Sequence, residues 1–458
     1  MKYWLETLGC PKNQVDSDKL SGLLEAGGYT PAGDPGRADL IVVNTCAFIE
    51  AARQESVDVI LELAALRRDG ARLAVTGCLA ERYGEELARA LPEADVVAGF
   101  GTPFTTRPAE SPGRPAGRPA SQPVGFPASA KRPSFDLLNL PRPAHRAPWA
   151  YVKVAEGCDR KCGFCAIPSF RGSQRSRSFD SVIAEVEALQ VEEVVLVAQD
   201  LASYGRDRGQ SPQGLPAPEL PASDWPPSGR PPSGRPSSGR PIEVLVRAVA
   251  ERVARVRLLY LYPSELTDGL IDVIGGTGCA YFDLSLQHVS RPLLRRMRRW
   301  GDGERFMDRL ARIRKQFPGA ALRSSFIVGY PGETEEDHEA LLEFLADAQL
   351  DWAGFFAFSN EEGTYAATLP GHVPPHVAAE RLGECQELQD RITARRRLSL
   401  VGEKTRVLID RPGVARSHRE APEIDGVVTV PEDRPAGSWA DVVVTGAFGT
   451  DLQAEWLV

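Results

Sequence analysis

The chain has 458 residues, of which 42% are hydrophobic and 25% are charged, and its formal net charge is −8. This length suggests about two to four domains, and the hydrophobic fraction is enough for several buried cores, which excludes a chain that is disordered throughout. The acidic balance argues against a protein that coats nucleic acid non-specifically, because such binding needs a basic surface.

The sequence carries no sign of a membrane or secreted protein. No apolar run reaches the roughly 18 residues of a membrane-spanning helix, and the opening MKYWLETLGC lacks the apolar core of a signal peptide. Eight cysteines are too few for a disulfide scaffold. We therefore expect a soluble cytoplasmic protein with reduced thiols and no membrane partner.

Residues 1–104 predict an open parallel α/β domain. Two β-branched runs, at 39–44 and 71–76, are each followed by a helix-forming stretch, at 47–66 and 79–91. Such alternation is typical of a parallel sheet covered by helices.

Two later stretches interrupt this pattern because they are crowded with proline, glycine, serine and arginine. Residues 105–145 are interpreted as an inter-domain linker, and residues 207–241, with a repeated Ser-Gly-Arg-Pro unit, as a flexible insertion within the next domain. An arginine-rich RNA contact is the alternative for these stretches, but a solvated insert is favoured.

Residues 146–395 predict a partial barrel of six βα units. The expected strands are 151–154, 194–198, 256–261, 281–286, 321–328 and 352–358, and the expected helices include 179–190, 292–316 and 335–350. Polar residues follow most of these strands, where a parallel barrel places its chemistry. Beyond a helix at about 375–400, the segment 396–458 shows short strands separated by turns and predicts a small all-β barrel.

The strongest chemical signal is the CxxxCxxC spacing of Cys158, Cys162 and Cys165, directly after the first barrel strand. Three thiolates on one loop can hold three irons of a [4Fe–4S] cluster and leave the fourth iron open. An open iron can bind S-adenosylmethionine, which the reduced cluster would cleave to a 5′-deoxyadenosyl radical. A zinc site is the alternative, but zinc normally takes four protein ligands.

A second trio, Cys10, Cys46 and Cys78, is dispersed in sequence, yet each cysteine follows a strand candidate. In a parallel sheet these strand ends meet on one rim, so the three thiols are expected to form a second site. The alternative is that they are buried core residues, which is common for free cysteines. Cys279 and Cys385 have no neighbour at ligand spacing and are expected to be structural.

These motifs resemble the radical-SAM methylthiotransferase family over nearly the whole chain. The resemblance rests on GCPKNQVDSDKLSG, NTCAFIEAARQES and TGCLAERYGEEL in the first domain, on AEGCDRKCGFCAIPSFRGSQRSR, YPSE and GYPGETEEDHEALLEF in the barrel, and on a tail similar to a TRAM module. GCPKN, CAIPSFRG and ARSHREAPEIDG are most similar to the RimO branch, whose members modify a ribosomal protein. Departures from the family are the insertion at 207–241, the long linker and Ser285, where a proline is typical.

The resemblance implies a fold and a reaction. The fold is an N-terminal methylthiotransferase domain, a radical-SAM barrel and a TRAM-like barrel. Cys10, Cys46 and Cys78 would bind an auxiliary [4Fe–4S] cluster that holds the sulfur to be transferred. One S-adenosylmethionine would methylate that sulfur and a second would generate the radical. The product would carry a methylthio group on the β-carbon of an aspartate in small-subunit ribosomal protein twelve, a carbon that acid–base catalysis cannot activate.

Other residues are candidates for binding the cofactor or the substrate. The candidate cofactor-binding residues are Phe164, Gly329, Gly332 and Glu333, and the candidate substrate-binding residues are Arg171, Arg175 and Arg177. Each assignment has a structural alternative. Phe164 could pack within its loop, residues 329–333 could form a plain strand-to-helix turn with a cap at Thr334, and the three arginines could lie on a solvated loop. No catalytic residue is assigned beyond the cluster ligands. His288 is expected to be structural and the arginine run 295–299 to be an exposed helix face.

The charge of the tail favours a protein substrate. From Arg397 onward there are seven Arg and Lys against ten carboxylates, a net charge of −3. An RNA-binding module would carry the opposite sign, and a basic ribosomal protein suits an acidic surface. The expected partners are this ribosomal protein, alone or on the ribosomal subunit, and an electron donor such as flavodoxin or ferredoxin. A tRNA adenosine methylthiotransferase of the MiaB type is the alternative, and a non-enzymatic iron–sulfur carrier a distant one.

Overall fold

The computed structural model describes residues 1–100, 137–143, 147–208 and 239–457. They form two compact units: Met1–Pro143 with Ser169–Arg171, and Ala144–Pro168 with Gly172–Val458. Most of the predicted linker at 105–145 and of the predicted insertion at 207–241 lies outside the described residues.

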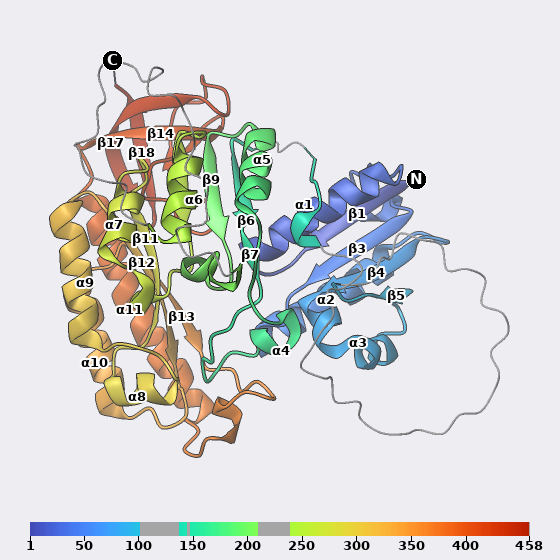
Figure 1. Cartoon of the computed structure of the whole chain (residues 1–458), viewed down its shortest axis with the longest axis horizontal. Helices are drawn as coiled ribbons and strands as arrows, with labels where there is room; N and C mark the ends of the chain where they lie inside the picture. Colours follow the sequence, from blue (N-terminus) through green and yellow to red (C-terminus); the bar gives the residue numbers. More distant parts are fainter. Residues whose placement is uncertain (101–136, 144–146, 209–238, 458) are drawn as a thin grey trace. The chain divides into compact units, whose positions relative to one another are not determined.

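The first unit contains a five-stranded parallel sheet in the order β2-β1-β3-β4-β5 (Figure 1). Its strands are β1 Lys2–Thr7, β2 Thr30–Pro31, β3 Leu40–Thr45, β4 Arg72–Gly77 and β5 Val96–Val97. The central strand β3 is buried along its whole length, which explains its continuous apolar run LIVVNT. The predicted open parallel α/β fold is confirmed.

Three helices connect these strands. α1 (Pro11–Ala26) follows β1, α2 (Glu50–Leu66) follows β3, and α3 (Cys78–Ala90) follows β4. α1 begins with a proline at its first position, where the missing N–H costs nothing. Because each helix starts just after a strand, the three strand-to-helix turns lie at the same edge of the sheet.

The second unit contains the six expected barrel strands, in two parallel three-stranded sheets, β10-β9-β6 and β11-β12-β13. Their bounds are β6 Trp149–Lys153, β9 Glu193–Val197, β10 Arg255–Leu258, β11 Tyr281–Gln287, β12 Ala321–Val328 and β13 Trp352–Ala357. The two sheets are joined by backbone hydrogen bonds of Leu261 to Asp283 and of Ser285 to Leu261. The strands therefore follow one another in chain order as a partial barrel, as predicted.

Helices cover this barrel and close its large apolar core (Figure 1). They are α5 Phe179–Leu189, α6 Pro241–Ala250, α7 Asp268–Gly275, α8 Arg291–Arg296, α9 Gly303–Gln316, α10 Glu335–Ala348 and α11 Pro375–Leu398. The prediction of one helix at 292–316 is wrong. The chain turns at Arg298 (φ 55°) and Gly301 (φ 117°), and Asp302 caps a new helix by accepting from the backbone N–H of Arg305.

The tail forms a closed five-stranded barrel, red in Figure 1, with its own apolar core. Its strands are β14 Lys404–Arg411, β15 Val414–Arg416, β16 Val428–Thr429, β17 Trp439–Phe448 and β18 Asp451–Trp456. The loop that leads from β15 to β16 packs against the first residues of the large barrel's strands. Tyr151 donates to the carbonyl of Pro422, Tyr281 donates to Asp425, and the Trp352 indole donates to the carbonyl of Arg419.

A buried charge network strengthens this contact. Glu193, at the start of β9, accepts hydrogen bonds from Arg257 at 2.8 Å and from Arg416 of the tail at 2.9 Å, with Arg255 at 3.5 Å. Although burial opposes ionisation, these three guanidinium groups hold the pKa of Glu193 at about 2. The tail therefore lies at the N-terminal ends of the strands, which leaves the C-terminal ends to the cysteine loop. Among the described helices, none combines the length and apolarity needed to cross a membrane.

Candidate functional site

The dispersed trio Cys10, Cys46 and Cys78 meets at one edge of the first unit's sheet. Strand register sets Thr7 of β1, Asn44 of β3 and Thr76 of β4 side by side. Each cysteine follows one of these three residues by two or three positions, so the three thiols share the C-terminal edge of the sheet. Two contacts agree with this convergence: Gly9, next to Cys10, lies against Cys46, and Cys78 Sγ lies 3.7 Å from Asn13 Oδ1 at the start of α1.

Two glycines allow the turns that carry the trio. Gly9 has φ 98°, and a Cβ placed there would lie 2.9 Å from Cys46 Cβ and 3.0 Å from its sulfur. Gly77 has φ 92°, and its Cβ would meet Asn44 Oδ1 at 2.4 Å and the Thr45 backbone nitrogen at 2.5 Å. Any side chain at either position would therefore displace the neighbouring strand end.

Arg171 contacts one thiol of this trio directly. Its Nη2 lies 2.9 Å and its Nε 3.3 Å from Cys78 Sγ. The same guanidinium donates to Asn13 Oδ1 at 2.7 Å and pairs with Asp16 Oδ2 at 3.2 Å. Its ring contact is with Phe100, 4.4 Å from the guanidinium carbon. The Arg171 side chain is only 3% exposed.

The environment affects the three thiols differently. Burial alone would raise the pKa of Cys10, but Lys12, Arg171 and the backbone N–H groups of Lys12 and Asn13 outweigh it, and this pKa is lowered. Burial raises the pKa of Cys46 to about 12 and also raises that of Cys78, although Arg171 opposes the second shift. Because bound metal requires thiolates, metal binding here would release protons.

The donor set of the first unit fits an iron–sulfur cluster. The three cysteines are free thiols, two of them buried, and they offer sulfur ligands. In the described part of the chain, no three His, Cys, Asp or Glu side chains are arranged for a single metal ion. Three thiolates can bind three irons of a four-iron cluster and leave the fourth iron open, whereas zinc normally takes four protein ligands.

The trio of the second unit lies on a loop that two short strands close. β7 (Ala155–Glu156) pairs antiparallel with β8 (Arg175–Ser176), and the Cys158 backbone N–H donates to the carbonyl of Gly172. At the loop's base, Gly157 has φ 78°, and a Cβ there would lie 2.2 Å from the Ser173 carbonyl oxygen. The loop therefore starts and ends at one point beside β6.

The loop is held from two further sides by Gly163 and by an arginine. Gly163 donates its N–H to the carbonyl of Met297 and accepts from Ala366. A Cβ on Gly163 would lie 2.8 Å from the Tyr330 hydroxyl. Arg160, within the loop, binds Asp200 at 2.6 Å and Glu265 at 2.9 Å. Both carboxylates follow barrel strands, so the strand ends position the cysteine loop.

Arg299 contacts this trio directly. Its Nη1 lies 3.4 Å from Cys162 Sγ, and its Nη2 donates to the carbonyl of Ser285. Arg160 and Arg299 both lie over the ring of Tyr262, at 4.1 and 4.2 Å. Burial raises the pKa of Cys158 to about 11 and that of Cys165 to about 12.

The candidate cofactor-binding residues lie in ordered turns. Phe164 packs against the barrel core. Gly329 and Gly332 have positive φ, at 76° and 82°, and Thr334 caps α10 together with Asp337. Glu333 accepts from the Tyr330 backbone N–H and lies 3.4 Å from Arg381. Burial raises the pKa of Glu333 to about 7. These contacts agree with the structural alternatives, and cofactor binding by these residues stays a prediction.

The three arginines predicted to bind substrate have different environments. Arg171 is buried against Cys78, as described above. Arg177 is 3% exposed, pairs with Glu185 and donates to Ser181. Arg175 is partly exposed. Arg171 and Arg177 are therefore buried and paired within the protein, and substrate binding by the three arginines stays a prediction.

Sequence reasoning missed Arg299, Arg160, Asn13 and Asp16 as site residues. The expectation of an exposed helix face at 295–299 is wrong for Arg299, because α8 ends at Arg296 and the turn directs this side chain to Cys162. His288 is buried, which lowers its pKa to about 4, and its Nδ1 accepts from the Ser290 backbone N–H. Cys279 and Cys385 are free and fully buried.

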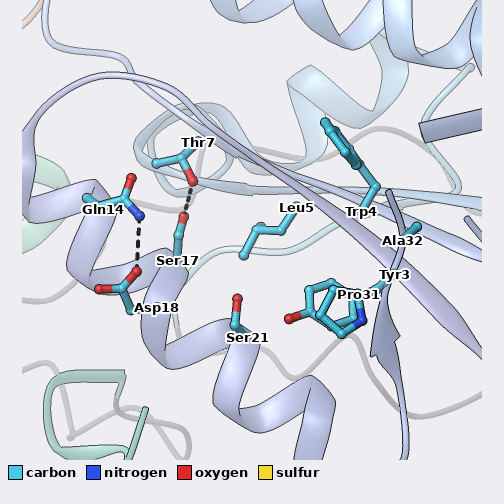
Figure 2. A pocket seen from close by; sticks show the side chains of 10 residues that line it. All are labelled: Tyr3, Trp4, Leu5, Thr7, Gln14, Ser17, Asp18, Ser21, Pro31 and Ala32. Carbon is cyan, nitrogen blue, oxygen red and sulfur yellow. Dashed lines mark hydrogen bonds between the residues drawn. The ribbon is translucent and has the colours of Figure 1, made fainter. Parts of the chain in front are cut away.

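The first unit also has a polar groove of about 250 Å³ between α1 and the β1–β2 edge. Figure 2 shows its lining side chains, among them the hydrogen-bonded pairs Gln14–Asp18 and Thr7–Ser17. No cysteine is among the residues that line it. The groove is therefore separate from the thiol site.

Three family models match the chain. They are the uncharacterized protein family UPF0004 at residues 2–99, the radical SAM superfamily at 152–345 and the TRAM domain at 401–457. Among solved structures, the radical S-adenosylmethionine methyltransferase TsrM from Kitasatospora setae, with cobalamin and a [4Fe–4S] cluster, is 15% identical with a TM-score of 0.48. That match covers 78% of this chain and 74% of the TsrM chain, and it is too distant to indicate a function.

Curated relatives are much more similar. The ribosomal protein uS12 methylthiotransferase RimO of Moorella thermoacetica is 42% identical over 451 residues, covering 96% of each chain. The RimO proteins of Cutibacterium acnes and Geobacter sulfurreducens are 39% and 41% identical, over 99% and 94% of this chain and 98% and 92% of their own. With this identity over nearly its full length, the chain belongs to the family of ribosomal protein uS12 methylthiotransferases RimO.

Proposed function

We propose that this protein transfers a methylthio group to the β-carbon of an aspartate of ribosomal protein uS12, using two [4Fe–4S] clusters and S-adenosylmethionine. The observation that carries the proposal is the pair of three-cysteine sites, each of which follows parallel strands at their C-terminal ends. Three ligands suit a four-iron cluster with one iron left open, and the reaction needs an open iron twice. One would bind S-adenosylmethionine and the other would hold the sulfur.

The division of labour follows from the two sites. Cys158, Cys162 and Cys165 would hold the cluster that binds S-adenosylmethionine, and Cys10, Cys46 and Cys78 would hold the auxiliary cluster. When bound, the first cluster with S-adenosylmethionine supplies the radical that removes a hydrogen atom from the unactivated carbon.

The chain's own residues would orient the reactants and protect the radical. Asp200 and Glu265 fix Arg160 and so the first cysteine loop, while Arg299 donates to Cys162. The barrel core consists of closely packed buried apolar side chains, which limits the access of water to reactive groups. Such preorganisation is what a scaffold must contribute when a cofactor performs the hard step.

Charge supports a basic protein as the substrate. Several cations of the tail are already paired: Arg397 with Glu420, Arg416 with Asp410 and Glu193, and Arg419 with Asp351. Because tail carboxylates Glu420, Asp410 and Asp425 (with Arg323) are used in internal pairs as well, the remaining charged side chains of the tail keep the net charge of −3. An acidic surface attracts a basic ribosomal protein and repels RNA. The proposed partners are uS12, either free or on its ribosomal subunit, and a low-potential electron donor such as flavodoxin or ferredoxin.

The test is an anaerobic reaction with reconstituted protein, reductant, sulfide, S-adenosylmethionine and uS12, followed by mass spectrometry. We expect a methylthio group on one aspartate of uS12. Cys46→Ala should abolish this product while 5′-deoxyadenosine still forms, and Cys162→Ala should abolish both. The matched control Cys279→Ala removes a buried cysteine outside the trios and should keep both products. Methylthio transfer by Cys46→Ala would contradict the proposed auxiliary site.

A further inference from the structure

The first unit's thiol site contains a residue from far along the chain. The family model that matches the first domain ends at residue 99, yet Ser169–Arg171 belong to the same compact unit as the three cysteines. Of these residues, Arg171 directs two of its nitrogens at Cys78 Sγ, at 2.9 and 3.3 Å. The cysteine-bearing domain therefore does not supply all of the groups around its own thiols.

The Arg171 guanidinium is held in place on several sides. Asn13 Oδ1 and Asp16 Oδ2 accept from it at 2.7 and 3.2 Å, and Phe100 covers its face. Asn13 is itself fixed, since its Nδ2 donates to the carbonyls of Leu8 and Thr45 at 2.8 and 3.0 Å. Fixed partners on both sides mean that the guanidinium meets the sulfur in one orientation rather than as a mobile charge.

The contact of Arg171 with the Cys78 sulfur would balance the negative charge of a bound cluster. An oxidised four-iron cluster with three thiolate ligands is a monoanion, and its reduced form is a dianion. Burying such a charge is costly unless a cation is paired with it. Asp16, which is 1% exposed, adds a negative charge nearby. A buried cation in hydrogen-bond contact with a ligand sulfur stabilises the reduced form more than the oxidised form, and hydrogen bonds to sulfur are known to set cluster potentials.

We propose that Arg171 is a positioning residue of the auxiliary cluster: it donates hydrogen bonds to the Cys78 sulfur and raises the cluster's reduction potential. The inference rests on the proposed function, because it takes Cys10, Cys46 and Cys78 as the cluster's ligands. It gives Arg171 a role different from the predicted binding of substrate. The contact also makes the segment after the other cysteine loop a part of the auxiliary site.

The test uses the full-length chain with Cys158, Cys162 and Cys165 changed to alanine, so that only the auxiliary cluster remains. Its iron content and its reduction potential, followed by electron paramagnetic resonance during a redox titration, provide the reference. If this protein binds no cluster, the ligand assignment fails and the inference fails with it. A bound cluster allows Arg171 to be tested separately.

In that background, Arg171→Gln should lower the ratio of reduced to oxidised cluster at least about tenfold at a fixed potential, a shift of about 59 mV for one electron. Arg171→Lys, which keeps the charge but loses the forked donor, should give an intermediate potential. The matched control is Arg142→Gln, which breaks the buried pair of Arg142 with Asp18 in the same unit. It should leave the potential unchanged. An unchanged potential in Arg171→Gln would overturn the proposal.

A direct observation decides the case if the Arg171→Gln protein does not fold. The same three-alanine protein is labelled with ¹⁵N-arginine, and pulsed electron paramagnetic resonance is recorded on the reduced cluster. A coupling between ¹⁵N and the cluster spin is expected and should disappear in Arg171→Lys. An arginine that makes no contact with the cluster would not give this coupling, so its absence from the labelled protein would overturn the proposal.

Discussion

Replacing Glu193 with glutamine should loosen the attachment of the tail barrel. Glu193 is fully buried and pairs with Arg257 and Arg416, with Arg255 near by, and each of these arginine side chains is at most 3% exposed. Glu193→Gln keeps the shape of the side chain but removes the negative charge that these three guanidinium groups share. Breaking a buried pair by removing one partner costs about 3–5 kcal/mol.

The measurement is hydrogen exchange followed by mass spectrometry on peptides that cover β14 and β15. A loss of about 3 kcal/mol corresponds to more than a hundredfold faster exchange of the amides that open with the tail. The matched control is Glu187→Gln, since Glu187 pairs with Arg252 at the surface. Its effect should stay within about 0.5 kcal/mol. Exchange in Glu193→Gln less than about tenfold faster than in the parent would refute the argument that this network secures the tail.

Three further predictions follow from the structure. Gly77→Ala should lose the iron of the auxiliary cluster, because its Cβ would lie 2.4 Å from the side-chain oxygen of Asn44 at the end of β3. Gly70→Ala is the control: Gly70 also has a positive φ, but nothing lies within 4 Å of its Cβ position, so iron analysis should find the cluster retained. Arg299→Gln should slow formation of 5′-deoxyadenosine at least about tenfold, since it removes the donor to a cluster ligand, and the exposed Arg295→Gln should not. Burial alone would raise the pKa of Glu420, but its ion pair with Arg397 outweighs burial and holds this pKa at about 2. The ionised Glu420 therefore stabilises the folded tail above the ordinary pKa of about 4.5, and this stabilisation is lost as the pH falls toward 2. Tryptophan fluorescence should show the tail loosening in that window, and a signal unchanged down to pH 2 would contradict this.

The cysteine trios could be predicted because their pattern is local to strand ends. Parallel strands place their C-terminal ends on one edge, so three cysteines that each follow a strand converge whatever their separation in sequence. The register of Thr7, Asn44 and Thr76 shows that this reasoning gave the correct edge. The barrel and the small tail barrel were predictable for a similar reason, since periodicity reports which faces are buried.

The roles of individual arginines could not be predicted in this way. Arg171 follows the second trio in sequence, but its partners Asn13, Asp16 and Cys78 lie more than 90 residues away along the chain. Arg299 belongs to a run with helical composition, and its inward orientation depends on the turn at Arg298, where φ is 55°. Such contacts depend on three-dimensional neighbours that composition and spacing do not encode.

The tail motif ARSHREAPEIDG has a structural explanation. Arg416 reaches Glu193, the carbonyl of Pro422 accepts from Tyr151, and Asp425 accepts from Tyr281. Residues of the motif that carries the resemblance to the RimO branch are therefore contacts that join the tail to the barrel.

The central claim is that this enzyme modifies uS12, and a competition experiment tests it most directly. The anaerobically reconstituted protein receives equal amounts of uS12 and of tRNA that lacks the methylthio modification, and both are analysed by mass spectrometry. The structure and the acidic tail predict a methylthio group on one aspartate of uS12 and none on tRNA. Methylthio transfer to tRNA adenosine, with uS12 unchanged, would contradict the account.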